Sequence, residues 1–168
     1  MEYKQTHIPY GLVTGLAMIV IGVILQVTNM NFAPGIKWLG IVPFIIGIIL
    51  NGIAFSKAND ANVTFGKVYG SCFKATAIIA IVMFVWSLAS LFIFPNMKDQ
   101  MIEMTRAEMA KNPGMSEEII EKSISITRKF YTSFLLGGAL FGSLLYGAIF
   151  SLIGAAVAKK KPQPVFPN

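Results

Sequence analysis

The sequence predicts an all-α integral membrane protein: a four-helix bundle with cytoplasmic N- and C-termini and a last transmembrane helix that extends outside the membrane. Hydrophobic residues make up 55% of the 168 residues and charged residues only 13%, whereas a soluble domain has roughly 25% charged residues. The charges are concentrated between four apolar stretches that contain almost none of them. Each stretch has about the 20 residues that a helix needs to cross a bilayer core of roughly 30 Å.

The predicted spans are residues 8–27, 36–55, 75–94 and 134–158. The only charge inside them is Lys37, at the start of the second span, where its aliphatic stem can reach the headgroups. A cleaved signal peptide is the alternative for the first stretch. We reject it because the apolar run is too long, Glu2 interrupts the basic segment, and no small-x-small cleavage site follows.

Lysine placement predicts the orientation, because Lys and Arg are retained on the cytoplasmic side of short loops. The terminal segments and the connection between the second and third spans carry Lys4, Lys57, Lys67, Lys74, Lys159, Lys160 and Lys161. An even number of spans places all of them on one side. The net charge of +6 therefore reflects topology, and we expect no nucleic-acid partner.

Glycines and one proline mark the first two spans. Gly11 and Gly15 form a GxxxG pattern, which lets a neighbouring helix approach closely. Pro43 lies in the middle of the second span, where it should kink the helix because its ring displaces one backbone hydrogen bond. We expect this kink to be structural, with a gating hinge as the alternative.

The approach to the third span has helical periodicity over residues 64–74. Thr64 is a suitable N-cap, and the mixture of aromatic residues with Lys67 and Lys74 predicts an amphipathic helix on the inner membrane surface. Cys72, the only cysteine, is expected to be a buried structural thiol, with S-palmitoylation as the alternative.

The fourth span has a small residue at every fourth position, and a second GxxxG pattern runs beside this stripe. The stripe consists of Ala139, Ser143, Gly147, Ser151 and Ala155, and the second pattern of Gly138 and Gly142. A period of four drifts around an α-helix, so the small residues form a spiral groove suited to close helix crossings. The groove packs either within the bundle or against another chain, and the sequence leaves both open.

The outer connection, residues 95–130, contains equal numbers of basic and acidic residues and is divided by Asn112-Pro113-Gly114. Before the break, a short amphipathic helix with a methionine-rich edge is expected. After it, Ser116 is an N-cap for a helix that runs to Ala158 without a breaker, roughly 65 Å in all, so about four turns should project from the membrane. Either the outer headgroups or a partner protein would cover the apolar residues of this connection, Met97, Met101, Met104, Ile120 and Ile124.

This organisation resembles a family of four-helix integral membrane proteins of unknown function, found mainly in Bacteroidota (domain of unknown function family 4199). The resemblance is carried by four spans in this length, by Val63-Thr64-Phe65-Gly66-Lys67 before the third span, by Pro95 after it, and by the charged helix before the fourth. It implies a multi-pass protein of the bacterial inner membrane. It implies no activity and no functional residues.

Taken together, residues 1–161 are predicted to form one transmembrane domain, followed by a disordered cytoplasmic tail, 162–168. We expect an inner-membrane accessory or scaffold protein without cofactor, metal or catalytic residues. It would act through contacts with the lipid bilayer and with a membrane-protein partner or a second copy of itself. A transporter or channel for a neutral or lipid substrate is the alternative, although the span interiors contain no Asp, Glu, Lys, Arg or His. A membrane enzyme is less favoured because the sole histidine, His7, has no catalytic partner nearby in the sequence.

Overall fold

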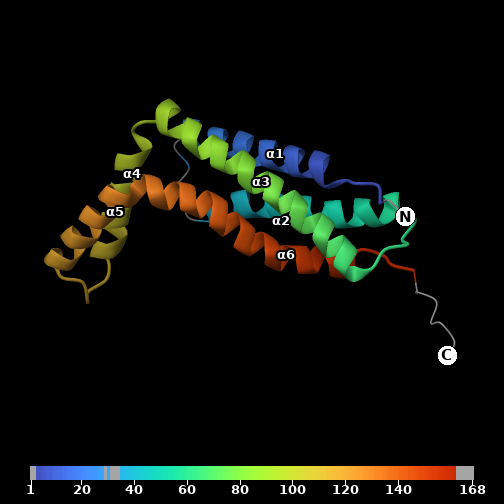
Figure 1. Ribbon diagram of the computed structural model, residues 1–168. Coiled ribbons are helices and arrows are strands. Elements are labelled where there is room, and N and C mark those ends of the chain that lie inside the picture. The colour runs from blue at the N-terminus through green and yellow to red at the C-terminus, as the bar shows by residue number, and fades with distance from the viewer. Residues whose placement is uncertain (1–2, 29, 31–34, 162–168) are drawn as a thin grey trace.

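A computed structural model describes residues 3–28, 30 and 35–161 and is all-α over these residues (Figure 1). Its elements are α1 (His7–Val27), α2 (Lys37–Ala58), α3 (Phe65–Ile93), α4 (Met97–Ala110), α5 (Glu117–Gly137), the π-helical turn η1 (Gly138–Gly142) and α6 (Ser143–Val157). The predicted tail, 162–168, lies outside the described residues.

Four helical stretches in the described chain are long and apolar enough to cross a membrane, which confirms the predicted number of spans. They are α1, α2, α3 and the continuous run from α5 to α6, with mean hydropathies of 2.0 to 2.4. Only 17 to 39% of the residues in these spans are buried inside the protein. Because most of their apolar surface therefore faces outward, the natural solvent for this surface is lipid.

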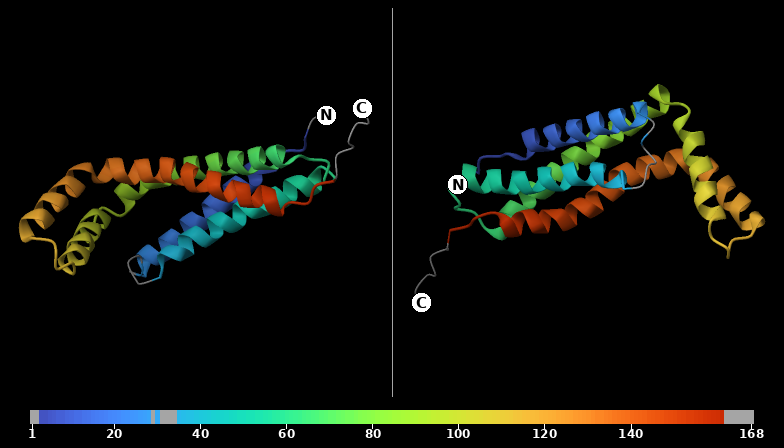
Figure 2. Two further views of the ribbon diagram at one scale, coloured as in Figure 1. Left: turned by 90° about the horizontal axis from the view of Figure 1, so that it is seen from below. Right: turned by 180° about the vertical axis from the view of Figure 1, so that it is seen from behind.

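The four long helices lie side by side, and α3 packs against α1, α2 and α6 (Figures 1 and 2). The helices α4 and α5 form a hairpin that turns away from the long axis of the bundle. The predicted extension of the last helix beyond its span is present as α5, and the structure adds its direction. Its outer turns bend sideways, because they pack on α4 rather than standing alone in solvent.

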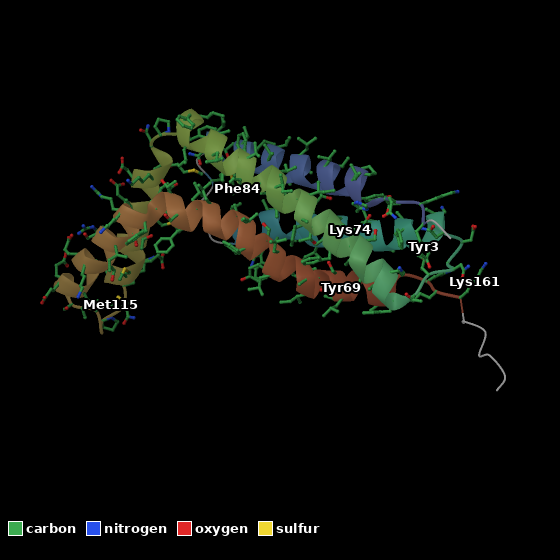
Figure 3. The ribbon with its side chains drawn as sticks, viewed as in Figure 1. Tyr3, Tyr69, Lys74, Phe84, Met115 and Lys161 are labelled. Atoms are coloured by element: carbon green, nitrogen blue, oxygen red, sulfur yellow. The ribbon has the colours of Figure 1, made fainter. Side chains whose placement is uncertain are left out.

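Both ends of the described chain lie at the same end of the bundle, which we call the terminal end; the opposite end is the hairpin end (Figure 1). The backbone amide of Lys4 donates to Oδ1 of Asn59 at 2.9 Å, and the amide of Lys161 donates to the carbonyl of Ala61 at 2.8 Å. Figure 3 shows Tyr3, Lys74 and Lys161 at the terminal end and Met115 at the tip of the hairpin.

The segment 65–74 does not form a separate surface helix, contrary to our expectation. It is the beginning of α3, which continues to Ile93 without interruption. Val68, Cys72 and Ala75 are buried on one face, because this face continues the stripe with which the span itself packs into the bundle. The Thr64 cap is confirmed, since its hydroxyl accepts from the amide of Lys67 at 3.4 Å. Cys72 is fully buried, as predicted.

The hairpin has a small core of its own, formed by Ile102 of α4 and by Ile120 and Ile124 of α5. The predicted Ser116 cap is confirmed by its hydroxyl, which accepts from the amide of Ile119 at 3.4 Å. An exposed ion pair between Arg106 and Glu121 also joins the two helices. We expected Ile120 and Ile124 to be available to a partner; they are instead covered by Ile102.

Truncating this core should open the hairpin without unfolding the bundle. For Ile124→Ala we expect a local cost of about 2–4 kcal/mol, because a buried isoleucine leaves a cavity. Amide hydrogen exchange should then rise throughout α4, while exchange in α1 to α3 should not change. Ile126→Ala is the matched control, because Ile126 is 47% exposed on the same helix. Equal exchange in the two variants would contradict an independent hairpin core.

Candidate functional site

The closest helix crossings in the bundle occur at glycines. A Cβ atom on Gly147 of α6 would lie 2.0 Å from Cγ2 of Thr76 on α3, and one on Gly47 of α2 would lie 2.0 Å from Oγ1 of Thr14 on α1. Real Cβ atoms do not approach other atoms so closely. These backbones therefore pack together only because the side chains are absent.

A third crossing brings α2, α3 and α6 together around Cys72. A Cβ on Gly52 would lie 2.8 Å from the carbonyl oxygen of Gly154 and 3.0 Å from Sγ of Cys72. The thiol donates to the carbonyl of Ile48 at 3.5 Å. We did not predict a packing role for Gly52 or Gly154 from the sequence. Gly154 follows Gly147 by seven residues, two helical turns, and this spacing is the signal that places both on one face.

The predicted packing residues divide into two groups. In the first group, Gly11 faces Ile78 and Gly15 faces Val82 across the α1–α3 crossing, at 2.8 Å from a built Cβ in each case. Also in this group are the residues of the spiral nearest the terminal end, which are buried inside the bundle: Gly147, Ser151 and Ala155.

The second group lies nearer the hairpin end and is not used for close helix packing inside the bundle. Ala139 and Ser143 are only partly buried. Gly138 and Gly142 have nothing within 4 Å of the position that a Cβ would occupy. The GxxxG pattern of α1 and that of η1 therefore have different environments: the first packs on α3, and the second faces open space.

A buried asparagine joins the helices at the terminal end. Asn51 is fully buried; its Oδ1 accepts from the hydroxyl of Thr6 at 2.8 Å, and its Nδ2 donates to Oγ of Ser71 at 3.2 Å. These bonds connect the residue before α1 with α2 and α3. Polar side chains inside a membrane bundle stabilise it when they are paired in this way, so we interpret Asn51 as a structural residue.

An apolar groove of about 610 Å³ lies between α2 and the η1–α6 run. Figure 2 (left) shows why it forms: α1 and α2 diverge from α3 and η1 toward the hairpin end. Phe44 and Phe150 meet edge to face at 6.1 Å. The lining residues are Met18, Trp38, Gly40, Ile41, Phe44, Ile45, Gly138, Gly142, Ser143, Tyr146 and Phe150.

Bare backbone forms part of both walls of this groove. Gly40 on the α2 wall, like Gly138 and Gly142 on the other, has open space at its Cβ position. Pro43 lies inside α2, within the stretch that supplies Gly40, Ile41 and Phe44 to the wall. The kink that we predicted at Pro43 remains a prediction.

The η1 turn is a departure from the continuous α-helix that we predicted from Ser116 to Ala158. The chain stays helical, but residues Gly138–Gly142 form a π-helical turn. A π turn adds one residue to the helical register and is frequent at functional sites. The turn shifts the register of the small-residue spiral between Ser143 and the hairpin, so the spiral is not one continuous surface.

The predicted methionine edge of α4 lies on the outer face of the hairpin. Met101 and Met104 are 40% and 36% exposed, and Met97 is partly buried. Ile102 instead faces α5. Met101 and Met104 therefore remain available to lipid or to a partner, and that role stays a prediction.

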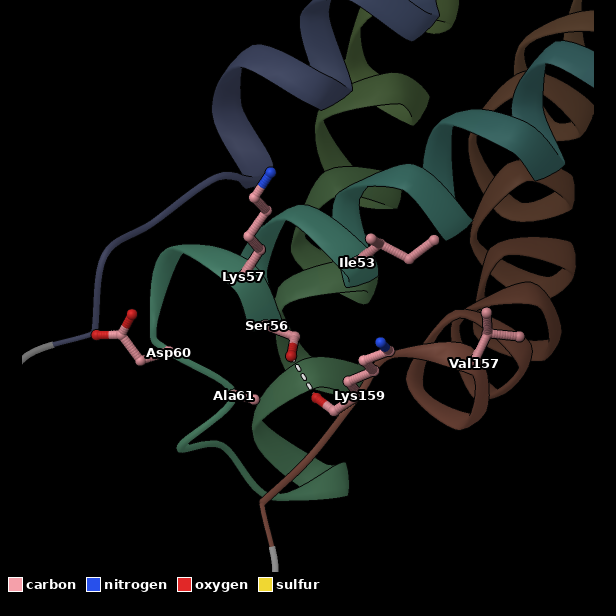
Figure 4. Close-up of a pocket in the computed structure, with 7 residues that line it drawn as sticks. All are labelled: Ile53, Ser56, Lys57, Asp60, Ala61, Val157 and Lys159. Atoms are coloured by element: carbon pink, nitrogen blue, oxygen red, sulfur yellow. Dashed lines mark hydrogen bonds between the residues drawn. The ribbon is translucent and has the colours of Figure 1, made fainter.

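Reactive side chains do not converge in the described part of the chain. Over residues 3–28, 30 and 35–161, no three His, Cys, Asp or Glu side chains are placed to hold a metal. A second cavity, of about 590 Å³, lies at the terminal end between α2 and the end of α6, but Figure 4 shows its Lys57 and Asp60 pointing in different directions. Ser56 donates to the carbonyl of Lys159 at this site, which ties the chain after α6 to α2.

These features define a class: a multi-pass, all-helical membrane protein with four spans, a glycine-packed terminal half and an apolar groove in the other half. A family profile described as "Protein of unknown function (DUF4199)" matches residues 9–160. The chain belongs to this family, which confirms the family resemblance of the sequence. No curated protein and no solved structure matches the chain significantly.

Proposed function

We propose that this protein is an accessory or scaffold subunit that binds one transmembrane helix of another membrane protein in the groove between α2 and η1–α6. The observation that carries the proposal is the distribution of its glycines. Gly11, Gly15 and Gly147 are among those used in crossings inside the bundle, whereas three others line one groove with nothing against them. In a membrane, bare backbone of this kind is where another helix packs closely.

We place the protein in a bacterial inner membrane, a location that the lysines and the family resemblance support. The terminal end carries Lys57, Lys67 and Lys74 together with Lys159–Lys161, so the positive-inside rule supports a cytoplasmic position for both termini. The hairpin is then on the outer side, periplasmic in a bacterial inner membrane. The groove lies in the half of the bundle nearest the hairpin, so a bound helix would be held mainly in the outer leaflet.

A partner helix accounts for the groove better than a lipid chain does. An acyl chain fills irregular apolar space without needing bare backbone, whereas close helix crossings require it. Trp38 and Tyr146 add large amphipathic surfaces, which are frequent at binding sites near membrane interfaces. Passage of a lipid or neutral substrate along the groove is the alternative, and the same variants test it.

The test is to fill the groove and compare partner retention. We expect Gly138→Leu/Gly142→Leu to fold normally, because both positions have open space, but to lose a partner that copurifies with the wild-type protein from native membranes in mild detergent. Gly137→Leu is the matched control: Gly137 also has open space but does not line the groove. It should retain the partner at the wild-type level.

Site-specific crosslinking identifies the contact itself. A photoreactive phenylalanine analogue in place of Ile45, in the groove wall, should crosslink to the partner, whereas the same replacement of Ile46, exposed outside the groove, should not. Equal crosslinking at both positions, or equal retention by all glycine variants, would contradict groove binding. If no protein is crosslinked but a groove-filled variant loses a substrate flux in proteoliposomes, the transport alternative replaces the scaffold function.

A further inference from the structure

The terminal end of the bundle has a basic surface with little opposing charge. Among the described residues of this end, Asp60 is the only acidic one, against seven lysines: Lys4, Lys57, Lys67, Lys74, Lys159, Lys160 and Lys161. The ion pairs found in the described chain all lie in the α4–α5 hairpin. The lysines of the terminal end therefore lack carboxylate partners within the described chain, and an anion supplied from outside would complement them.

Two of these lysines border a defined pocket of about 270 Å³ between the segment before α1 and the first three turns of α3. Lys67 and Lys74 are seven residues apart on α3, which places them on one face with a separation of about 10 Å along the helix. Lys67 is held there, since its Nζ lies 5.5 Å from the ring centre of Tyr3. Gln5 adds a polar side chain, and the pocket contains no acidic residue.

The floor of this pocket is bare helix. Gly66 and Gly70 belong to the lining, and neither has an atom within 4 Å of the position that a Cβ would occupy. Side chains there would fill the space between the two lysines. The pocket also lies at the N-terminal end of α3, where the helix dipole favours negative charge. The lysines, the open floor and the dipole all favour the same kind of ligand, a compact anion.

The position of the pocket relative to the membrane selects the kind of anion. The helix α3 has 29 residues, or roughly 43 Å, so it exceeds a bilayer core of about 30 Å by some nine residues. Its uncharged part begins directly after Lys74. The excess turns, from Phe65 to Lys74, therefore stand at the depth of the lipid headgroups, where phosphate groups are concentrated.

We propose that this pocket, bordered by Lys67 and Lys74 and floored by Gly66 and Gly70, binds the phosphate headgroup of an anionic phospholipid. The acyl chains would continue from it along the outward-facing apolar surface of the bundle. Lys57 and Lys159 have a different role, because they lie around the neighbouring cavity together with Asp60 (Figure 4). They contribute a general attraction to an anionic surface. The site is separate from the α2/η1–α6 groove and does not depend on what that groove binds.

The experiment measures lipid binding to the purified full-length protein by native mass spectrometry, with phosphatidylglycerol or phosphatidylcholine added to neutral detergent. We expect the wild type to retain phosphatidylglycerol preferentially. Lys67→Gln/Lys74→Gln should weaken that binding by roughly 30-fold, since each lysine at a membrane surface contributes about fivefold. The matched control, Lys57→Gln/Lys159→Gln, removes the same charge from the same end. It should bind nearly as well as the wild type, because a neutral micelle offers no anionic surface for these two lysines to attract.

A second variant tests the pocket without altering charge. Gly70→Leu should weaken phosphatidylglycerol binding by filling the floor, while its melting temperature stays close to that of the wild type because the position is open. Equal loss in both lysine double variants, or unchanged binding by Gly70→Leu, would overturn the proposal in favour of diffuse attraction. Tighter binding of free glycerol phosphate than of phosphatidylglycerol would overturn it in favour of a soluble phosphate ligand.

Discussion

The variant Gly147→Leu is expected to lose the folded bundle. Gly147 of α6 contacts α3 so closely that even a Cβ atom would lie 2.0 Å from Cγ2, 2.6 Å from Oγ1 and 2.8 Å from Cβ of Thr76. Thr76 is fully buried and β-branched, so it cannot rotate out of the way. Overpacking of a rigid core costs about 1–3 kcal/mol and more when backbone must move. A leucine here forces α3 and α6 apart, and we expect a cost above that range.

Thermal unfolding in detergent, followed by circular dichroism and gel filtration, measures this effect. Gly142→Leu is the matched control, because it lies five residues earlier in the same helical run and has open space. It should unfold at nearly the wild-type temperature. A compensating pair adds a second check: Thr76→Gly removes all three close atoms and should restore much of the stability that Gly147→Ala loses. Equal melting temperatures for the Gly147 and Gly142 variants would contradict the assigned crossing.

The second large effect is expected from Asn51→Leu, which keeps the volume of the side chain but removes its hydrogen bonds. The hydroxyls of Thr6 and Ser71 would both lose their partner, and Ser71 is buried. Interhelical hydrogen bonds in membranes contribute about 0.6 kcal/mol on average and up to roughly 1.7. A buried group without a partner costs about 1–3 kcal/mol. We expect a destabilisation of about 1–3 kcal/mol in all.

Single-sided variants show whether Asn51 acts as a bridge. Thr6→Val and Ser71→Ala each remove one bond, and each should destabilise the protein less than Asn51→Leu does in the same thermal assay. Unfolding by a denaturing detergent provides an independent measure of the stability of each variant. A variant Asn51→Leu as stable as the wild type would mean that apolar packing replaces the network without cost, as it sometimes does for buried polar groups.

These two variants and the groove variants separate folding from function. Gly147 and Asn51 lie where the helices hold one another, so their replacement should damage every property of the protein. Gly138 and Gly142 lie in the same helical run as Gly147 but have nothing within 4 Å of the position that a Cβ would occupy. Loss of partner binding in a stable Gly138→Leu/Gly142→Leu variant would therefore reflect the groove and not the fold.

The features that depend on local chemistry were predictable from the sequence. The four spans follow from the length of the uncharged stretches, and the caps at Thr64 and Ser116 follow from side chains that bond amides three residues away. The separation of the two outer helices follows from Asn112-Pro113-Gly114, which lies between α4 and α5. In each case residues that are neighbours in the chain supply the whole interaction.

The candidate sites were predictable only in part. Gly138 and Gly142 were recognised as a packing pattern, but the pattern looks the same as that of Gly11 and Gly15, which is filled by α3. The basic pocket was not recognised, because Tyr3 and Gln5 come from a segment more than 60 residues before Lys67 and Lys74. The hairpin core was missed for the same reason, since Ile102 covers Ile120 and Ile124 from another helix.

The sequence by itself determined that this chain is an all-helical protein with four membrane-spanning stretches, because hydrophobic length and helix caps act locally. Only the tertiary structure decided which glycines are buried, that the residues from Phe65 onward belong to α3, and that a groove forms between α2 and the η1–α6 run. The physical reason is that a small residue only permits close approach. Whether a helix, a lipid or nothing occupies the space depends on neighbours that are distant in the chain.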